Sequence, residues 1–311
     1  MFSYSKPIDV VYSNKKLPSL RSPSLICGLP GTGFVGKVAI DYLIKELGAV
    51  HLADIYSTFF SPQIIIKHDG TTEIVKNSVY YVKRENKKSK NTTIKTQPLP
   101  ENGQEISNSD KSKSVNILEP ASSDLLLLTG DSQPIVPGSE YVLTEQILDD
   151  MTKFDISNIY SLAAYVTGAF TNAPKIYGTA TATKLVGLFR NHNVSSLDNG
   201  NITGMNGIII GLGKLRGIDG LCLLGETSGY VIDAIAAKKI LETITRILNI
   251  QINMDEITKR AKDTEILIKN LEQQMLAKSN QGAQGLMGEE RQDDERQFFS
   301  QNRRSNMGYI S

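Results

Sequence analysis

One stretch of this chain carries residues that could bind phosphate, between a short apolar run and a helical pattern. Read as Gly31-x-Gly33-x-x-Gly36, it matches the dinucleotide fingerprint, in which amides at a helix N-terminus hold a pyrophosphate. Asp54 lies at a suitable distance downstream to bind a ribose hydroxyl. The fit is imperfect, because Gly28-Leu29-Pro30 separates the predicted strand from the first glycine of the fingerprint.

Read as Gly31-x-x-x-x-Gly36-Lys37, the same stretch matches a P-loop as far as its lysine. Val38 then occupies the position at which a Ser or Thr hydroxyl would hold Mg²⁺. A third interpretation is architectural, since glycines let the backbone turn sharply and let a helix pack closely on a sheet. We favour this structural role for Gly28, Gly31, Gly33 and Gly36, and expect no bound cofactor.

Few other residues suggest catalysis or metal binding. The three histidines are not spaced with other ligands as a metal site requires, and no nucleophile-elbow motif is present. Glu226, within Gly225–Gly229, could act as a general base where a strand ends. Its alternative role is at a helix start, where Thr227 or Ser228 caps the helix and Glu226 favours its positive end. We expect no catalytic and no metal site.

Composition limits the class of protein. The chain has 311 residues, 40% of them hydrophobic, which is enough for a full core, and a formal net charge of +1. That charge implies no general attraction to nucleic acid or to acidic membranes. Two cysteines in apolar runs form no disulfide framework, the N-terminus lacks a signal-peptide core, and no apolar stretch could span a bilayer. We therefore expect a soluble cytoplasmic protein.

Apolar runs alternating with helical patterns predict an α/β fold with a mostly parallel sheet covered on both faces. A hairpin is predicted at Asp69-Gly70, and strands at 73–75 and 79–82 around Asn77-Ser78. The other predicted strands are 24–28, 49–55, 63–67, 124–130, 156–166 and 176–180; the predicted helices are 38–47, 138–153, 183–191 and 230–248; and two runs, 207–211 and 217–225, bracket a second glycine-rich turn.

Three segments lie outside this pattern. Residues 83–119 are polar and Lys-rich, and we interpret them as a disordered insertion in a domain spanning 1–252. Residues 253–278 form a predicted C-terminal helix, beginning with Asn253 and Glu256 as an N-cap pair. Residues 279–311 form a predicted disordered tail. The helix carries a heptad seam, from which we expect homo-oligomer contacts at Ile257, Ile268, Leu271 and Met275.

Four motifs in order carry a resemblance to a known family: the glycine-rich stretch 28–36, Gly130–Pro134, Ala163–Gly168 and Leu223–Ala237. Together they make the chain similar to the proteasome assembly chaperone family, in particular its archaeal single-chain members, over about residues 20–250 without the insertion. The resemblance implies a three-layer α/β/α domain akin to nucleoside phosphorylases, self-association, and no catalysis. It also implies ATP-independent binding to proteasome α-subunits that promotes core-particle assembly.

Some family members end in a hydrophobic–Tyr–any tripeptide that inserts between α-subunits. Here the last residues are Tyr309, Ile310 and Ser311, so Ile stands where Tyr is expected. On the resemblance we take these three as partner-binding residues. Two alternatives stay open: a nucleotide- or nucleoside-binding enzyme that uses the Gly31–Lys37 turn and Glu226, and an interaction scaffold unrelated to proteasomes.

Overall fold

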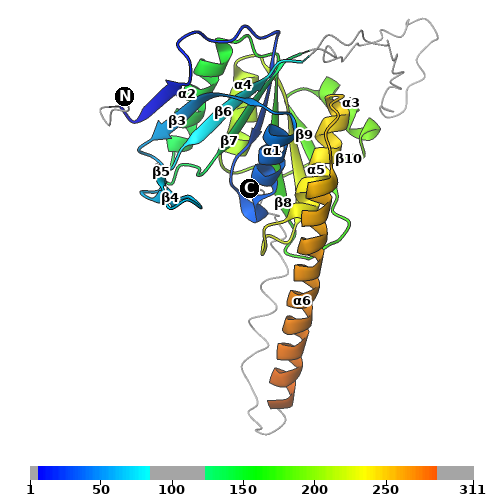
Figure 1. Cartoon of the computed structure of the whole chain (residues 1–311). Helices are drawn as coiled ribbons and strands as arrows, with labels where there is room; N and C mark the ends of the chain where they lie inside the picture. Colours follow the sequence, from blue (N-terminus) through cyan, green and yellow to red (C-terminus); the bar gives the residue numbers. More distant parts are fainter. Residues whose placement is uncertain (1–5, 85–122, 286–311) are drawn as a thin grey trace, which may run out of the picture.

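A nine-stranded mixed sheet forms the centre of the molecule (Figure 1). The computed structural model describes residues 6–84 and 123–285, with side chains described as far as residue 275. The strands are β1 (Ile8–Tyr12), β2 (Ser24–Gly28), β3 (Val50–Ser57), β4 (Ile64–Ile66), β5 (Thr72–Ile74), β6 (Asn77–Val82), β7 (Leu125–Gly130), β8 (Asn158–Val166), β9 (Ile176–Ala180), β10 (Val194–Ser196) and β11 (Asp219–Thr227).

The sheet has a parallel centre and antiparallel flanks. Its strand order is β1-β3-β6-β7-β2-β8-β11-β9-β10, and β4 pairs with β5 in a separate hairpin. Strands β7, β2, β8 and β11 are parallel, whereas β6 and β9 join this centre in the antiparallel direction. Every residue of β2 and β7 is buried, as expected for parallel strands covered on both faces.

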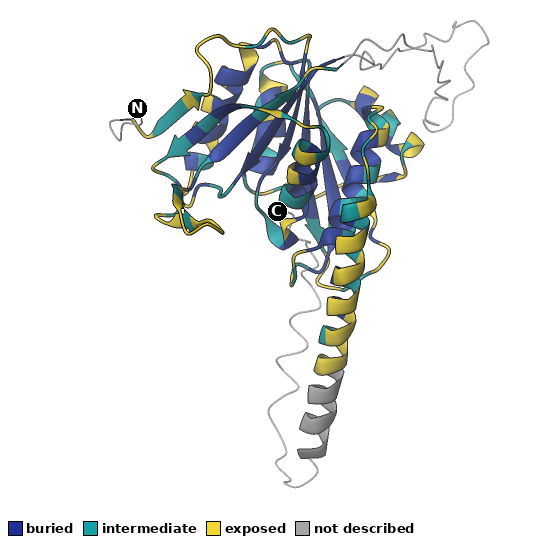
Figure 2. Cartoon of the chain, viewed as in Figure 1, coloured by how far each residue is buried: buried dark blue, intermediate teal, exposed yellow. Residues whose placement is uncertain are grey.

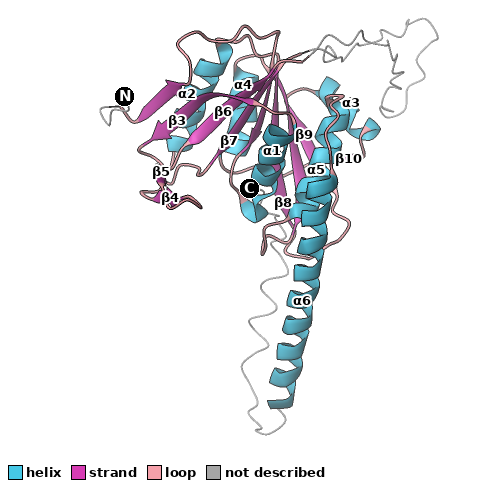
Figure 3. Cartoon of the chain, in the orientation of Figure 1, coloured by secondary structure: helices cyan, strands magenta, loops and turns pink. Residues whose placement is uncertain are grey.

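Helices cover both faces of the sheet and complete three layers (Figure 3). They are α1 (Val35–Glu46), α2 (Ser139–Thr152), α3 (Thr183–Asn191), α4 (Met205–Leu215), α5 (Ala234–Ile247) and α6 (Asp255–Gly285), with a short 3₁₀ turn at Thr32–Phe34. One core lies under α2 and α4 and includes Leu143 and Ile209. The other lies under α1, α3, α5 and the start of α6 and includes Ile40, Ile240 and Ile257. The predicted three-layer α/β fold is confirmed, with a sheet that is mixed.

Three local predictions are wrong. Residues 207–211 do not border a turn but lie inside α4, because Ile209 packs into the core and Gly213 packs against Ile159. Asn77 and Ser78 are not a turn but the first residues of β6. Helix α5 begins at Ala234 rather than at Tyr230, and its cap is the Asp233 carboxylate, which accepts hydrogen bonds from the Ile235 and Ala236 amides at 3.1 and 2.9 Å.

Helix α6 is anchored at its start and projects beyond the body at its end (Figures 1 and 2). Asn253 Oδ1 accepts a hydrogen bond from the Asp255 amide at 2.7 Å, as the predicted cap requires, whereas Glu256 pairs with Lys45 of α1 and with Arg260. The helix has 31 residues, which corresponds to about 46 Å of length. It ends at Gly285, seven residues later than predicted.

The Asp124 carboxylate holds together the two segments that flank residues 85–122. Asp124 Oδ1 accepts a hydrogen bond from the Arg84 amide at 2.8 Å, and Oδ2 accepts one from the Arg21 amide at 2.8 Å. Burial raises the pKa of Asp124, but these bonds outweigh it and hold the pKa below its usual value. Val82 pairs with Leu125, so the two ends are neighbours in the sheet. Apart from Lys83 and Arg84, the predicted insertion lies outside the described residues.

The closest backbone approach in the glycine-rich stretch is that of α1 to β8. A Cβ atom at Gly36 would lie 2.1 Å from the Leu162 carbonyl oxygen, which is far inside contact distance. A Cβ at Gly28 would lie 2.4 Å from the Gly36 carbonyl oxygen. These glycines therefore let strand, helix and neighbouring strand meet backbone to backbone, which is the architectural role predicted for them.

Replacing Gly36 with Ala is expected to lower the free energy of unfolding by about 1–3 kcal/mol, because the methyl group forces α1 away from β8. Chemical denaturation followed by circular dichroism measures the change. Gly211→Ala in α4 is the matched control, since nothing lies within 4 Å of its added Cβ, and it should leave stability unchanged or raise it by up to about 1 kcal/mol. Equal stability of the two variants would contradict the contact.

Candidate functional site

The glycine-rich turn packs against the loop that follows β11. Gly33 has a φ angle of +65°, and the Gly33 carbonyl oxygen accepts a hydrogen bond from the Asp233 amide at 2.9 Å. A Cβ at Gly33 would lie 3.0 Å from the Thr227 hydroxyl oxygen. That hydroxyl in turn donates to the Asp233 carboxylate at 2.7 Å. The turn is thus held by protein groups and positions the start of α5.

Lys37, the lysine of the P-loop pattern, is paired within the protein. Its ammonium group lies 2.9 Å from the Asp41 carboxylate one helical turn later and 3.4 Å from the Thr129 hydroxyl. Thr129 also donates to Asp41 at 2.5 Å. The lysine therefore links α1 to β7, and its charge is balanced by Asp41. Together with Val38, which cannot bind a metal ion, this arrangement does not favour a nucleotide site.

Asp54 does not lie where a dinucleotide site needs it. It belongs to β3, and strands β6 and β7 separate β3 from the strand that precedes the glycine-rich turn. Its carboxylate accepts hydrogen bonds from Ser78 at 2.6 Å and Lys76 at 2.9 Å, and it lies 2.8 Å from a ring nitrogen of His51. Burial raises its pKa, but these three bonds outweigh burial and lower it. This position does not favour the ribose contact of the dinucleotide reading.

Glu226, the candidate general base, fixes a loop. Its carboxylate accepts a hydrogen bond from the Lys175 amide at 2.9 Å, and its own amide donates to the Lys175 carbonyl at 3.0 Å. Both bonds fasten the residue before β9 to the end of β11. The position of the carboxylate is explained by this contact rather than by the helix-start role, which belongs to Asp233.

Apolar side chains that are exposed or half-buried lie just after the parallel strands β2, β8 and β11. We call Phe34, Phe170, Tyr230 and Ile232 the strand-end patch. Tyr230 and Ile232 are 68% and 61% exposed and Phe34 is 43% exposed. The rings of Phe170 and Tyr230 lie 5.9 Å apart. Grouped apolar side chains at a surface are typical of protein-binding sites. The sequence pattern did not indicate this patch, because it places Tyr230 and Ile232 inside a helix.

The candidate oligomer contacts on α6 divide into two groups. Ile257 and Ile268 are 0% and 3% exposed, so the chain itself already buries them. Leu271 is half-buried and Met275 is 54% exposed. Together with Leu267, which is 46% exposed, they follow a spacing of four residues and share one helix face. We call these three residues the α6 stripe. Tyr309, Ile310 and Ser311 lie outside the described residues.

Two general features are absent from the described residues. No helix there is both long and apolar enough to cross a bilayer. In the same part of the chain, no group of three or more His, Cys, Asp or Glu side chains is arranged to hold a metal ion. Cys27 and Cys222 are both buried, and burial raises the pKa of the two thiols.

Known proteins resemble this chain along most of its length. The uncharacterized protein MJ1210 of Methanocaldococcus jannaschii is 30% identical over 266 residues, covering 84% of this chain and 89% of the relative. The crystal structure of Pyrococcus furiosus PbaB, described as an archaeal proteasome activator, matches with a TM-score of 0.68 and 30% identity and covers 86% of this chain and 99% of PbaB.

Pyrococcus furiosus PbaA, described as an archaeal homolog of proteasome-assembly chaperone, matches with a TM-score of 0.62. Its identity of 21% supports the shared fold alone; the match covers 90% of this chain and 98% of PbaA. The model of the PAC2 family matches residues 25–272, which include the glycine-rich turn, the strand-end patch and the first part of α6. The chain therefore belongs to the PAC2 family.

Proposed function

We propose that this protein is a non-enzymatic, ATP-independent chaperone that binds proteasome α-subunits and promotes assembly of the core particle. The observation that carries the proposal is the likeness to PbaB, a proteasome activator, at 30% identity over 99% of PbaB. Membership of the PAC2 family adds support. The site itself favours a binding protein, since its notable surfaces are apolar and its phosphate motif is occupied by protein contacts.

In this proposal, the projecting helix α6 brings the residues that follow it to the partner. Helix α6 carries the α6 stripe away from the body and is followed by residues 286–311, which include Tyr309, Ile310 and Ser311. An apolar pair such as Tyr309 and Ile310 suits a pocket that offers an apolar slot. In this proposal the body presents the helix, and the last residues bind between α-subunits.

Activation of the mature core particle is the second candidate function, because PbaB is described as an activator of the proteasome. The two functions are separated by adding the purified protein to different partners. An assembly chaperone speeds formation of core particles from isolated subunits, as followed by native mass spectrometry. An activator raises peptide hydrolysis by particles that are already complete. Absence of binding to subunits and to particles would reject both.

Binding to proteasome subunits is expected to proceed equally with ATP and Mg²⁺ or with EDTA and no nucleotide. The physical reason is that Lys37 is paired with Asp41 and that Val38 replaces the metal-binding hydroxyl. Isothermal titration with each nucleotide and binding assays under both conditions test this. Saturable nucleotide hydrolysis that is lost in Lys37→Ala, with the fold intact, would contradict the proposal.

Removal of Tyr309, Ile310 and Ser311 is expected to weaken α-subunit binding at least ~10-fold, or about 1.4 kcal/mol, through loss of the apolar contact. Surface plasmon resonance with immobilised α-subunits measures the affinity. Unchanged affinity after the deletion would confine recognition to the folded domain.

We also propose that the protein is a homo-oligomer with contacts at Leu271 and Met275. The double variant Leu271→Asp/Met275→Asp is expected to reduce the mass measured by light scattering, because burial of two carboxylates in an apolar contact is unfavourable. Gln273→Asp/Gln274→Asp is the control on the same helix and should keep the mass. An oligomer of unchanged mass in the first variant would remove the α6 stripe from the interface.

A further inference from the structure

The β4–β5 hairpin presents an apolar face to solvent. Ile64 lies opposite Ile74, and Ile66 lies opposite Thr72. Residues two apart in a strand share a face, as do residues that lie opposite each other in a strand pair, so Ile64, Ile66 and Ile74 lie on one face. They are 59%, 72% and 44% exposed, and Figure 2 shows the hairpin largely in yellow. We call these three residues the isoleucine face.

The other face of the hairpin holds it against the body. Ile65 is half-buried and packs against the core that lies under α2 and α4. Glu73, opposite Ile65, pairs with Lys67 and lies 4.0 Å from Lys76. The hairpin is thus fixed through its inner face, while the isoleucine face stays in contact with solvent. Large apolar side chains grouped at a surface in this way are typical of protein-binding sites.

A cavity of about 520 Å³ adjoins the isoleucine face. Ile64 and Ile74 line it from the hairpin, and Tyr56, Phe60 and Pro62 line it from the end of β3 and the segment that follows. We call this cavity the edge groove. None of the residues that line it carries a charge. The edge groove therefore suits an uncharged, apolar segment of a protein, because burial of an unpaired charge there is unfavourable.

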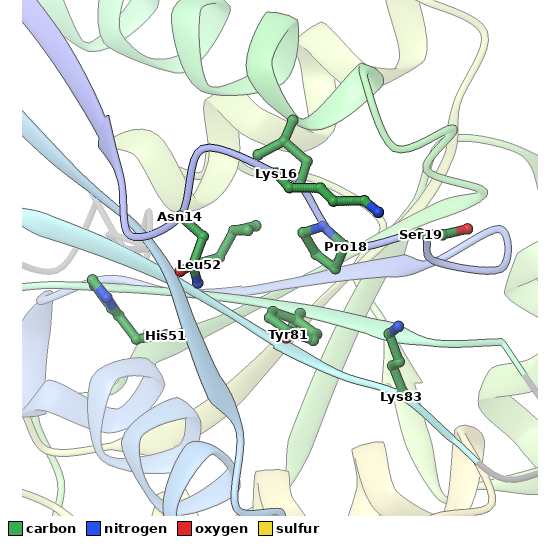
Figure 4. A pocket seen from close by; sticks show the side chains of 9 residues that line it. Asn14, Lys16, Pro18, Ser19, His51, Leu52, Tyr81 and Lys83 are labelled. Carbon is green, nitrogen blue, oxygen red and sulfur yellow. The ribbon is translucent and has the colours of Figure 1, made fainter.

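A second cavity, of about 390 Å³, provides a contrast (Figure 4). It lies beside the start of β3 and the end of β6, and thus at the opposite end of these strands. Lys16, Lys83 and His51 are among the residues that line it. Two lysines favour a partner that carries negative charge. An uncharged apolar segment therefore suits the edge groove better than this cavity.

Strand directions place the edge groove and the projecting helix at the same edge of the sheet. Because β3 is antiparallel to β6 and β6 is antiparallel to β7, β3 runs in the same direction as β7, β2, β8 and β11. The hairpin follows the end of β3, and the strand-end patch follows the ends of β2, β8 and β11. Helix α6 projects beyond this same edge (Figure 1). A partner held by the projecting part of α6 therefore lies on the side of the edge groove.

Apolar side chains connect the hairpin to the strand-end patch. Ile135 and Val136 follow β7, which lies between β6 and β2 in the sheet, and both residues are exposed. The Ile135 amide donates to the Phe59 carbonyl at 2.9 Å, which holds this segment beside the one that leads to the hairpin. The apolar surface thus extends along the edge from β3 to β11.

We propose that the edge groove and the isoleucine face bind an uncharged, apolar segment of a proteasome α-subunit, as a second contact beside that of α6 and the residues after it. The inference rests on the proposed function. A concave groove is not complementary to itself across a two-fold axis, so a second copy of this chain fits it less well. Two contacts on one partner strengthen binding, because the second forms within an existing complex.

Ile64→Asp and Ile66→Asp, made singly in the full-length protein, are expected to weaken α-subunit binding at least ~10-fold, because binding would bury a carboxylate in an apolar contact. The melting temperature should not change, since both side chains are exposed. Leu215→Asp is the matched control and should bind like the unmodified chain, because Leu215 is 83% exposed and ends α4 at the opposite edge, where β11 begins.

The outcomes separate this inference from the proposed function. Equal affinity of the three variants and the unmodified chain would overturn the second contact alone. Failure of the unmodified chain to bind α-subunits would reject the proposed function and, with it, this partner.

A combined variant tests whether the two contacts are separate. Ile66→Asp together with removal of Tyr309, Ile310 and Ser311 is expected to weaken binding at least ~100-fold, because contacts at distant sites contribute additively to the free energy of binding. Surface plasmon resonance with immobilised α-subunits measures the affinity. A combined effect no larger than that of the deletion alone would contradict a second contact.

Photocrosslinking locates the contact without depending on a change in affinity. The residue p-benzoylphenylalanine in place of Ile66 is expected to crosslink to an α-subunit on irradiation, and the same residue in place of Leu215 is not. Mass spectrometry of the crosslinked peptides should identify an apolar segment without charged residues. Crosslinks only to a second copy of this chain, or none at all, would overturn the proposal.

Discussion

The backbone contact between α1 and the centre of the sheet determines where the other functional elements lie. Gly28, Gly36 and the Leu162 carbonyl meet without side chains between them, so α1 packs closely on β2 and β8. The Gly33 carbonyl reaches the Asp233 amide, and Asp233 caps α5. Helix α6 packs on α5 and is fastened to α1 by Tyr42, whose hydroxyl donates to the Asn253 carbonyl at 2.9 Å. These contacts connect the glycine-rich stretch to the start of the projecting helix.

The same contact accounts for the spacing of the glycines without a ligand. In nucleotide-binding proteins the glycines make room for the ligand. Here the space beside Gly28 and Gly36 is filled by the protein's own backbone, and Lys37 is neutralised by Asp41. A pattern of glycines therefore indicates that another group comes close to the backbone. Only the surrounding residues show whether that group is a ligand or another strand.

Sequence predicted the architecture well because its buried strands are uninterrupted apolar runs, β2 and β7 above all. It failed where one pattern suits two structures: the Ile-rich run around Ile209 is helical only because of what it packs against. The predicted cap of α5 was wrong because Thr227, Ser228 and Asp233 are all residue types that cap helices well. The hydrogen bond from the Asp233 amide to Gly33 is what distinguishes Asp233. The contact between His51 and Asp54 could not be foreseen, since it depends on a bulge in β3 and a bulge leaves no clear trace in sequence.

Asp124 has a consequence for how this domain tolerates change. Because its carboxylate binds both Arg84 and Arg21, and because β6 and β7 are adjacent, the chain leaves and re-enters the sheet at one fixed point. The connection between those strands is topologically a hairpin, whatever its length. Doubling the length of such a closed segment costs only about 0.6 kcal/mol. The connection between β6 and β7 is therefore a suitable site for inserting a fluorescent reporter or an affinity module, because the sheet keeps its register.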